Sequence, residues 1–179
     1  AKGTLWWALT LHPELRSVYV INDYTASGKA AAKTIQKDLE DFAPDVEVRY
    51  SGNLDLPDLL KEVDSLPKDS LILYGVYHRD KNGRFYDIGE AAAAVAARSK
   101  VPVYGLNDSN LGHGIVGGML TSGYSQGQSM AQIALHVLAG RYPKDIQVIR
   151  EGVSSPMFDY EVLRKFDINL ADLPEGSEI

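Results

Sequence analysis

Apolar runs of strand length alternate with segments of helical period from Val18 to about Leu138, and no other feature of this sequence constrains the fold as strongly. Strands that alternate with helices favour a parallel sheet, because each connection between parallel strands needs a long crossover. The run 71–76 has no charged residue and is expected to be a central strand, covered on both faces. We therefore predict an α/β fold, a Rossmann-like parallel sheet flanked by helices.

Six segments have the pattern of strands, and five helices are expected between or after them. The expected strands are 18–21, 46–50, 71–76, 101–105, 115–119 and 146–150. The expected helices follow Gly28, Asp55, Asp87, Ser125 and Asp159. Asp87 with Glu90, and Ser125 with Gln128, have the spacing of a capping box. The first helix carries Lys29, Lys33 and Lys37 on one face, which we interpret as a solvated face and not as a binding patch.

Composition narrows the classes of function. The 179 residues, 45% of them hydrophobic, suit one folded domain or two small ones, and the net charge of -6 argues against a nucleic-acid partner. The chain has no cysteine, and its 4 histidines lack the spacing of metal ligands, so we expect no metal site. We also expect no cofactor. The glycines of 112–117 match a dinucleotide fingerprint in letters but precede a strand instead of joining a strand to a helix, so they are expected to allow positive φ.

The chain offers no apolar stretch close to the roughly 20 residues that a membrane-spanning helix needs. Any membrane attachment is therefore expected to lie in segments outside this chain. The sequence begins at Ala1 without methionine, and we interpret it as a piece of a longer protein.

Candidate binding residues follow from the strand predictions. Ligands of open α/β sheets bind beyond the carboxyl ends of the strands, which points to the loops 22–28, 51–54, 77–80 and 106–114. In the first loop, Thr25, Ala26 and Ser27 bring hydroxyl and N–H groups to a helix N-terminus, where an anion is favoured. The alternative is that Thr25 or Ser27 only caps the helix.

Two further loops carry polar side chains of mixed chemistry. The segment 77–80 combines an aromatic ring, an imidazole, a guanidinium and a carboxylate, and can either grip a polar molecule or form a plain surface turn. The segment 107–110 has short hydrogen-bonding side chains that suit a ligand or a turn equally well. The same loops leave an enzymatic function open. A small α/β enzyme could use His78 with Asp80, or His113 with Asp108, as general acid and base.

Several motifs occur in an order that is familiar from one protein family. They are Leu11-His-Pro-Glu-Leu15, Asp23-Tyr-Thr-Ala-Ser-Gly28, Val101-Pro-Val-Tyr-Gly105, Leu111-Gly-His-Gly-Ile-Val-Gly-Gly118, Gly127, Val137-Leu-Ala-Gly140, Phe158-Asp159 and Leu173-Pro-Glu-Gly-Ser177. Together they resemble the ABC-transporter substrate-binding-protein family of type I periplasmic binding folds. In particular they resemble the version that serves as the extracytoplasmic sensor of bacterial histidine kinases and diguanylate cyclases.

The resemblance implies a two-lobed protein that clamps a small ligand, such as an amino acid, between Rossmann-like lobes. It implies that the N-terminal lobe is missing here, that 1–122 forms the C-terminal lobe, and that 123–179 forms a return helix, a short strand and an exit segment. The ligand-facing positions that it implies are Asp23, Thr25, Ala26, Ser27, Tyr77, His78, Asn107 and Asp108.

The role implied is a periplasmic sensor that signals by lobe closure and is tethered to the inner membrane by regions outside this chain. The alternative role is the solute-binding component of an ABC transporter. Neither role requires catalysis, so we expect no enzymatic activity. Apolar surface meant for the absent lobe is expected to favour a homodimer.

Overall fold

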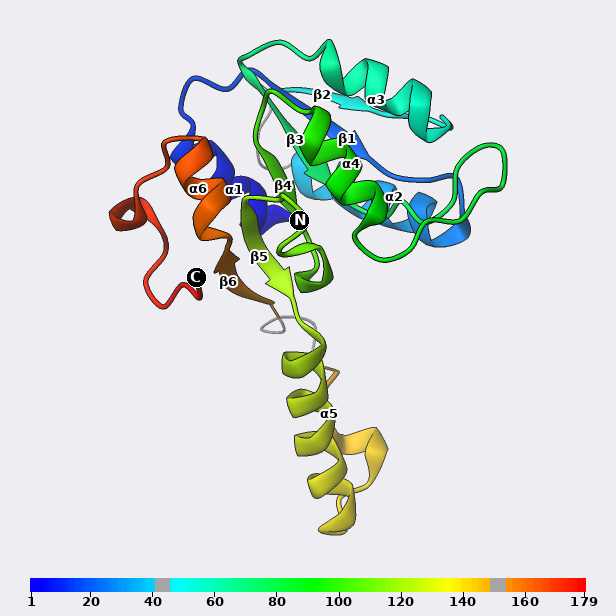
Figure 1. The fold of residues 1–179 in the computed structure, drawn as a ribbon. Helices are drawn as coiled ribbons and strands as arrows, with labels where there is room; N and C mark the ends of the chain where they lie inside the picture. Colours follow the sequence, from blue (N-terminus) through cyan, green and yellow to red (C-terminus); the bar gives the residue numbers. More distant parts are fainter. Residues whose placement is uncertain (41–45, 149–153) are drawn as a thin grey trace.

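One sheet of six strands organises the molecule. The computed structural model describes residues 1–40, 46–148 and 154–179, and the strand order is β2-β1-β3-β4-β5-β6 (Figure 1). The first five strands in this order pair in parallel, and β6 pairs antiparallel with β5. The strands are β1 (Ser17–Ile21), β2 (Glu47–Tyr50), β3 (Ser70–Tyr74), β4 (Val103–Gly105), β5 (Gly117–Thr121) and β6 (Ser154–Phe158). The predicted α/β class is confirmed.

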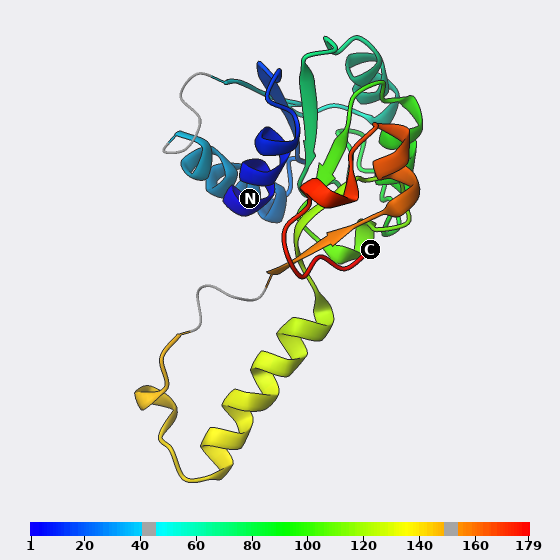
Figure 2. The ribbon, with the colours of Figure 1, turned by 90° about the vertical axis from the view of Figure 1, so that its left-hand side faces the viewer.

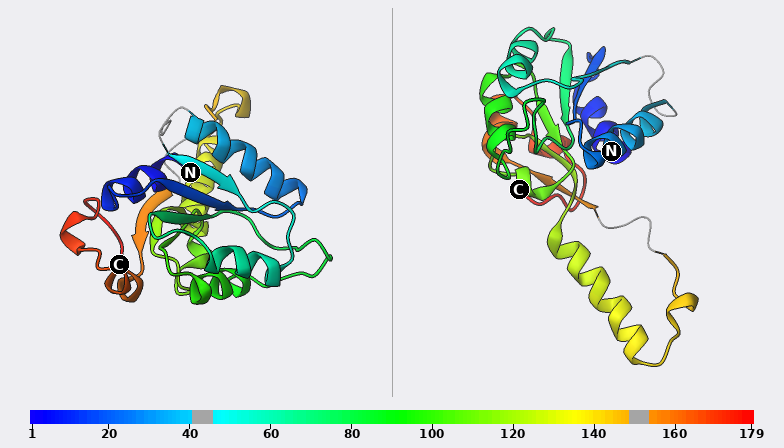
Figure 3. Two further views of the ribbon diagram at one scale, coloured as in Figure 1. Left: turned by 90° about the horizontal axis from the view of Figure 1, so that it is seen from above. Right: turned by 90° about the vertical axis from the view of Figure 1, so that its right-hand side faces the viewer.

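Helices cover both faces of the sheet. They are α1 (Lys2–Leu11), α2 (Ala26–Glu40), α3 (Leu56–Asp64), α4 (Glu90–Arg98), α5 (Gly123–Leu138) and α6 (Tyr160–Lys165). Short 3₁₀ turns occur at Asp108–Asn110, Pro143–Asp145 and Leu170–Asp172. Seen from above, α1 and α2 lie on one face of the sheet, and α3 and α4 lie on the other (Figure 3). In the described ranges, no helix is long and apolar enough to cross a membrane.

Alternating side chains of β1 build the two halves of the core. Val18 and Val20 pack with residues of α1, α2 and α6, whereas Tyr19 and Ile21 pack with residues of α3 and α4. All five residues of β3 are buried, as expected of the central strand. The edge strand β2 is mostly exposed, and Tyr50 retains 39% of its accessible surface. The helices therefore hold β1 and β3 rigidly, which positions the loops that follow these strands.

Three helix starts differ from prediction because the capping residues differ. The helix α4 begins at Glu90, with Gly89 as its N-cap, and not directly after Asp87. The helix α2 begins at Ala26 and not after Gly28, since Thr25 Oγ1 accepts a hydrogen bond from Gly28 N at 3.1 Å. The helix α5 begins at Gly123, where Ser122 accepts from Ser125 N, so the predicted cap at Ser125 is wrong by three residues. The predicted cap at Asp159 is confirmed, because its carboxylate accepts from two amides of α6.

The last strands also differ from prediction. The apolar residues Ile115 and Val116 are buried, but the strand begins after them at Gly117, where pairing with β6 begins. The predicted strand 146–150 is not found in 146–148, and Arg150 lies outside the described residues. The sheet is completed instead by β6, and α6 then packs Leu163 into the core beside α1 and α2.

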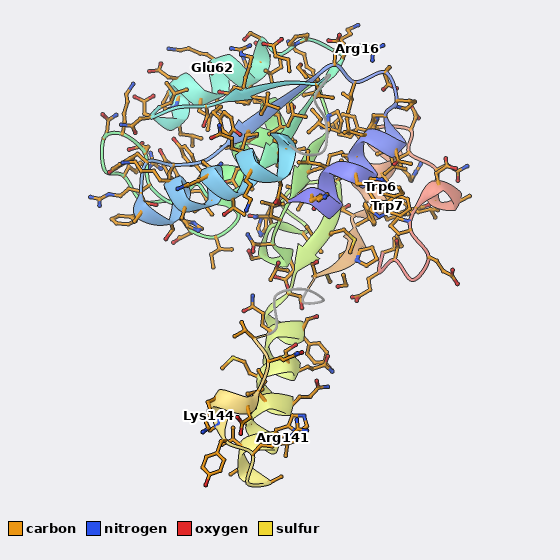
Figure 4. All side chains as sticks on the ribbon, turned by 180° about the vertical axis from the view of Figure 1, so that it is seen from behind. Trp6, Trp7, Arg16, Glu62, Arg141 and Lys144 are labelled. Carbon is orange, nitrogen blue, oxygen red and sulfur yellow. The ribbon has the colours of Figure 1, made fainter. Side chains whose placement is uncertain are left out.

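The helix α5 projects away from the sheet, followed by the chain to 148 (Figures 1 and 2). Arg141 and Lys144 lie at the outer end of this projection (Figure 4). No residue of α5 is buried, although five large apolar residues on α5 are exposed: Tyr124 at 75%, Met130 at 70%, Leu135 at 65%, Val137 at 39% and Leu138 at 83%. A helix of this length is marginally stable without tertiary packing, so α5 needs a partner surface.

Candidate functional site

A groove runs along the carboxyl ends of β3, β4 and β5. It consists of two adjoining cavities, of about 300 and 360 Å³, which share Gly75, Asn107 and Thr121 as common lining residues. We call these two cavities the strand-end groove. Their position is the one that parallel α/β sheets use for ligands, and their volumes suit a small molecule.

Four of the predicted ligand-facing residues line the first cavity of the groove. Tyr77 and His78 come from the loop after β3, and Asn107 and Asp108 from the loop after β4. These loops are 29 positions apart in the chain and are brought together because β3 and β4 are neighbours in the sheet. The other lining residues of this cavity are Tyr74, Gly75, Asp87, Ile88, Gly89, Ser109, Asn110, Thr121, Gly123 and Gln126.

The second cavity extends the groove between α1 and α2. Gly3 and Thr4 of α1 face Ala31 and Thr34 of α2 across it. Thr4 is buried, and its Oγ1 accepts a hydrogen bond from Met119 N at 3.1 Å, which fixes α1 against β5. This side of the groove is more apolar than the first and adjoins Val76 and Leu106.

Asp23 joins the loops after β1 and β3. Its Oδ1 accepts hydrogen bonds from Thr25 N and Thr25 Oγ1, and its Oδ2 accepts from His78 N at 2.8 Å and Arg79 N at 3.2 Å. Asp23 is 5% exposed, so a ligand would have to displace these donors to reach the carboxylate. The residue therefore positions His78 at the groove, and it lines neither of the two groove cavities.

Thr25, Ala26 and Ser27 form the first turn of α2. Thr25 caps the helix, as its contact with Gly28 N shows, while Ala26 and Ser27 are exposed. Gly28 is needed here because a Cβ at this position would lie 2.2 Å from Asp23 Oδ1. None of the three residues lines a groove cavity in this structure. Their part in ligand binding stays a prediction.

Tyr77 is largely a core residue. Its side chain is 2% exposed, its Oη donates a hydrogen bond to Leu54 O at 3.0 Å, and burial raises its pKa. His78, by contrast, is exposed at the groove. We therefore expect Tyr77→Ala to lower the stability of the fold, because alanine would leave a cavity in the core.

Arg79 and Asp80 turn away from the groove into the small hairpin 79–85. The Arg79 guanidinium lies 4.7 Å from the centre of the Phe85 ring, and Arg79 Nε donates to Gly83 O. The buried Asp80 carboxylate accepts from Asn82 N, Arg84 N and Tyr86 Oη. Gly83 N also donates to Asp80 O at 2.9 Å, so residues 80–83 form a tight turn that the Asp80 carboxylate stabilises.

The Tyr86–Asp80 contact predicts an acid-dependent loss of stability. Burial alone would raise the pKa of Asp80, but hydrogen bonds from Tyr86 Oη and from the Arg84 and Asn82 amides outweigh burial and lower it. A lowered folded-state pKa stabilises the fold above the ordinary carboxyl pKa, and this contribution is lost as pH falls through the lowered value. We expect Tyr86→Phe to cost about 1.5 kcal/mol at pH 7 and less at pH 3 in urea unfolding. Equal losses at both pH values would contradict this, and Tyr142→Phe serves as an exposed control.

The two predicted acid–base pairs are not assembled. Asp80 is occupied by its turn, whereas His78 is exposed on the groove side. The His113 ring packs over Gly89, where a Cβ would lie 2.5 Å from Nε2, and no hydrogen bond joins His113 to Asp108. Within the described parts of the chain, no three or more His, Asp or Glu side chains gather as metal ligands would.

Sequence reasoning missed several residues of the groove. Gly75 lies at the end of β3 and could have been found from the strand prediction, since a Cβ there would lie 2.3 Å from Asn22 Oδ1. The sequence pattern predicts β5 two residues too early and α5 too late. It therefore does not point to the lining residues Thr121, Gly123 and Gln126.

Comparisons with known proteins agree with this architecture. No protein-family model matches the chain, and no curated protein matches it in sequence. The ligand-free substrate-binding protein CD0873 of Clostridium difficile is similar in structure, with a TM-score of 0.74 at 13% identity over 98% of this chain. An ABC domain from Streptococcus pneumoniae in complex with L-Trp has a TM-score of 0.67 at 15% identity over 99% of this chain. A conserved domain protein from Vibrio cholerae has a TM-score of 0.66 at 15% identity over 99%.

The chain therefore shares its fold with these proteins, one of which is a substrate-binding protein. It spans only 58% of the Clostridium protein and 60% of the other two. The projecting helix α5 is included in the matched part, because the matches cover almost all of this chain.

Proposed function

We propose that this chain is part of a small-molecule-binding protein and that the strand-end groove is one wall of its ligand site. The observation that carries the proposal is the groove itself, formed where His78, Asn107 and Asp108 meet at the carboxyl ends of β3 and β4. The fold shared with substrate-binding proteins supports it. No catalytic step is needed, and the unassembled acid–base pairs argue against the enzyme alternative.

The chemistry of the groove suits a compact ligand with several hydrogen-bonding groups. Asn107 offers both donors and an acceptor, Asp108 offers a carboxylate for an amino group, and His78 offers an imidazole. The more apolar second cavity, beside Val76 and Leu106, can take a side chain. An amino-acid-like molecule fits this division, and one protein of the same fold binds L-Trp.

The opposite wall is assigned to a second lobe that precedes this chain in a longer protein. The chain spans about three-fifths of its structural relatives, and α5 leaves the sheet with its apolar side chains uncovered. In this arrangement α5 would pack on the second lobe. The chain that returns from α5 to β6 would then link the two lobes. Closing the lobes around a ligand would then bury the groove.

As to role, we propose an extracytoplasmic sensor that reports its ligand by lobe closure, on the strength of the sequence resemblance to such sensors. A transport-binding protein is the second candidate, because CD0873, which shares the fold, is a substrate-binding protein. The parent reading frame separates the two. A membrane helix followed by a kinase or cyclase module supports the sensor, whereas a stop codon soon after Ile179 with an upstream export signal supports the carrier.

Replacing Asn107 or His78 tests the groove. In the two-lobed protein, screened with the twenty L-amino acids beginning with L-tryptophan, we expect Asn107→Ala and His78→Ala to raise the dissociation constant about tenfold each. Isothermal titration calorimetry gives the constants. The exposed Lys68→Ala is the matched control, since Lys68 lies outside the groove. Unchanged affinity in both variants would sink the proposed site.

The 179-residue chain is expected to self-associate when the second lobe is absent. Without self-association, Leu135 and Leu138 on α5 would remain exposed to water. In sedimentation velocity we expect a concentration-dependent dimer, which Leu135→Lys with Leu138→Lys returns to monomer. The two-lobed protein should be monomeric at the same concentration. A wild-type chain that stays monomeric would show that α5 needs no cover.

A further inference from the structure

A third cavity lies on the other flank of α2, outside the strand-end groove. Its volume is about 410 Å³, within the range of small-molecule sites. Helix α2, the loop after β1 and the loop after β2 form its walls. Its lining residues are Val20, Asn22, Asp23, Tyr24, Lys29, Ala32, Lys33, Gln36, Tyr50, Ser51, Gly52 and Asn53.

The body of α2 separates this cavity from the groove. Ala31, Thr34 and Ile35 line the groove side, whereas Ala32 and Lys33 line the opposite side. The third cavity and the two groove cavities share no lining residue. A molecule in the third cavity would therefore bind independently of the contacts proposed for the groove.

Lys29 and Lys33, which the sequence pattern assigns to a solvated face, line the third cavity and give it a positive side. Lys29 and Lys33 are one turn apart on α2, so they lie on the same face of the helix. In the described ranges, neither ammonium group has a carboxylate within ion-pair distance. The acidic lining residue Asp23 already accepts four hydrogen bonds from Thr25, His78 and Arg79. The cavity is thus complementary to an anion.

A buried amide in its wall lacks a hydrogen-bond acceptor. Asn22 is 7% exposed, and its Oδ1 accepts from Val76 N at 2.9 Å, but its Nδ2 has no partner within the described structure. Buried donors are paired in almost all proteins, so this group calls for an acceptor. Asn22 lines the third cavity and neither groove cavity, so its amide belongs to the wall of this cavity, although the Nδ2 atom itself is covered.

The rest of the lining favours an apolar body. Val20 and Ala32 form part of the wall, and Tyr24 and Tyr50 also line the cavity. We propose that the third cavity is a second binding site, for a small organic anion with a flat apolar body and a carboxylate. The carboxylate would face Lys29 and Lys33, and the apolar body would lie against Tyr24 and Tyr50.

Titration of the 179-residue chain with benzoate, followed by amide NMR, tests the site. We expect saturable shifts at the amides of Ala32, Lys33, Gly52 and Asn53, and weaker binding at high salt because the pair of lysines is exposed. Benzamide has the same shape without the charge, and we expect its dissociation constant to be about fivefold higher or more. Shifts confined to His78 and Asn107 would place benzoate in the groove and overturn the proposal.

Variants on one helix separate charge from shape. Lys29→Gln with Lys33→Gln is expected to weaken benzoate binding about fivefold or more, while Lys37→Gln, one turn further along α2 and outside the cavity lining, should leave it unchanged. Ala32→Leu fills the cavity and should abolish binding with both lysines present. Equal weakening by Lys37→Gln, or undiminished binding in Ala32→Leu, would refute the site. Neither result bears on the groove, whose test uses Asn107 and His78.

Discussion

Asp23→Ala is expected to lower the free energy of unfolding by about 3 kcal/mol, because one carboxylate serves four donors from two loops. Hydrogen bonds to a charged acceptor are among the stronger ones, and alanine leaves His78 N and Arg79 N without an acceptor. Urea unfolding followed by circular dichroism measures the loss. The same substitution should release His78 from the groove and so impair ligand binding as well.

A graded series makes this result specific to the carboxylate. Asp23→Asn keeps one acceptor but presents an NH₂ group to two N–H donors, so we expect it to be about as costly as alanine. Asp69→Ala removes an exposed carboxylate before β3 and should change stability by less than about 0.5 kcal/mol. If Asp23→Asn were as stable as the wild type, the hydrogen bonds to Oδ2 would contribute nothing to the free energy of unfolding.

Gly117→Ala is expected to be at least as damaging, at about 3 kcal/mol or a drop of about 10 °C in melting temperature. Gly117 has φ of 128°, which L residues rarely adopt, and a Cβ would lie 2.2 Å from Met157 O. The residue pairs with Tyr104 of β4 and with Phe158 of β6, so neither neighbour can yield without breaking the sheet. Differential scanning calorimetry measures the change.

Two other glycines separate backbone strain from steric overlap as causes of the loss of stability. Gly52 has φ of 65° but open space around a Cβ, so Gly52→Ala isolates backbone strain and should cost about 1 kcal/mol. Gly127 lies within α5 with nothing near a Cβ, and alanine there should be neutral or stabilising by up to about 1 kcal/mol. A small effect of Gly117→Ala, comparable to that of Gly52→Ala, would mean that β6 can move away from β5.

Local patterns in the sequence determined the parallel part of the sheet. Buried runs such as 71–74 and half-exposed alternation at Val48 follow directly from hydrophobicity, since the burial of side chains stabilises each strand. The helix caps Asp55 and Asp159 could also be predicted from the sequence, because the free N–H groups at a helix N-terminus need an acceptor close in sequence. These patterns were sufficient to place the loops that border the groove.

The tertiary structure decided the rest, because the contacts concerned join residues far apart in the chain. Asp23 was expected to face a ligand, yet its carboxylate is taken by amides 55 and 56 positions away, and no local pattern reports such donors. Tyr77 was expected at the site and is largely buried by packing beside Tyr86. The strand β6 has no clear alternation and forms only because β5 offers it an edge. The sequence by itself determined that the five parallel strands form, whereas long-range hydrogen bonding and packing decided the sixth strand and which side chains remain free to meet a ligand.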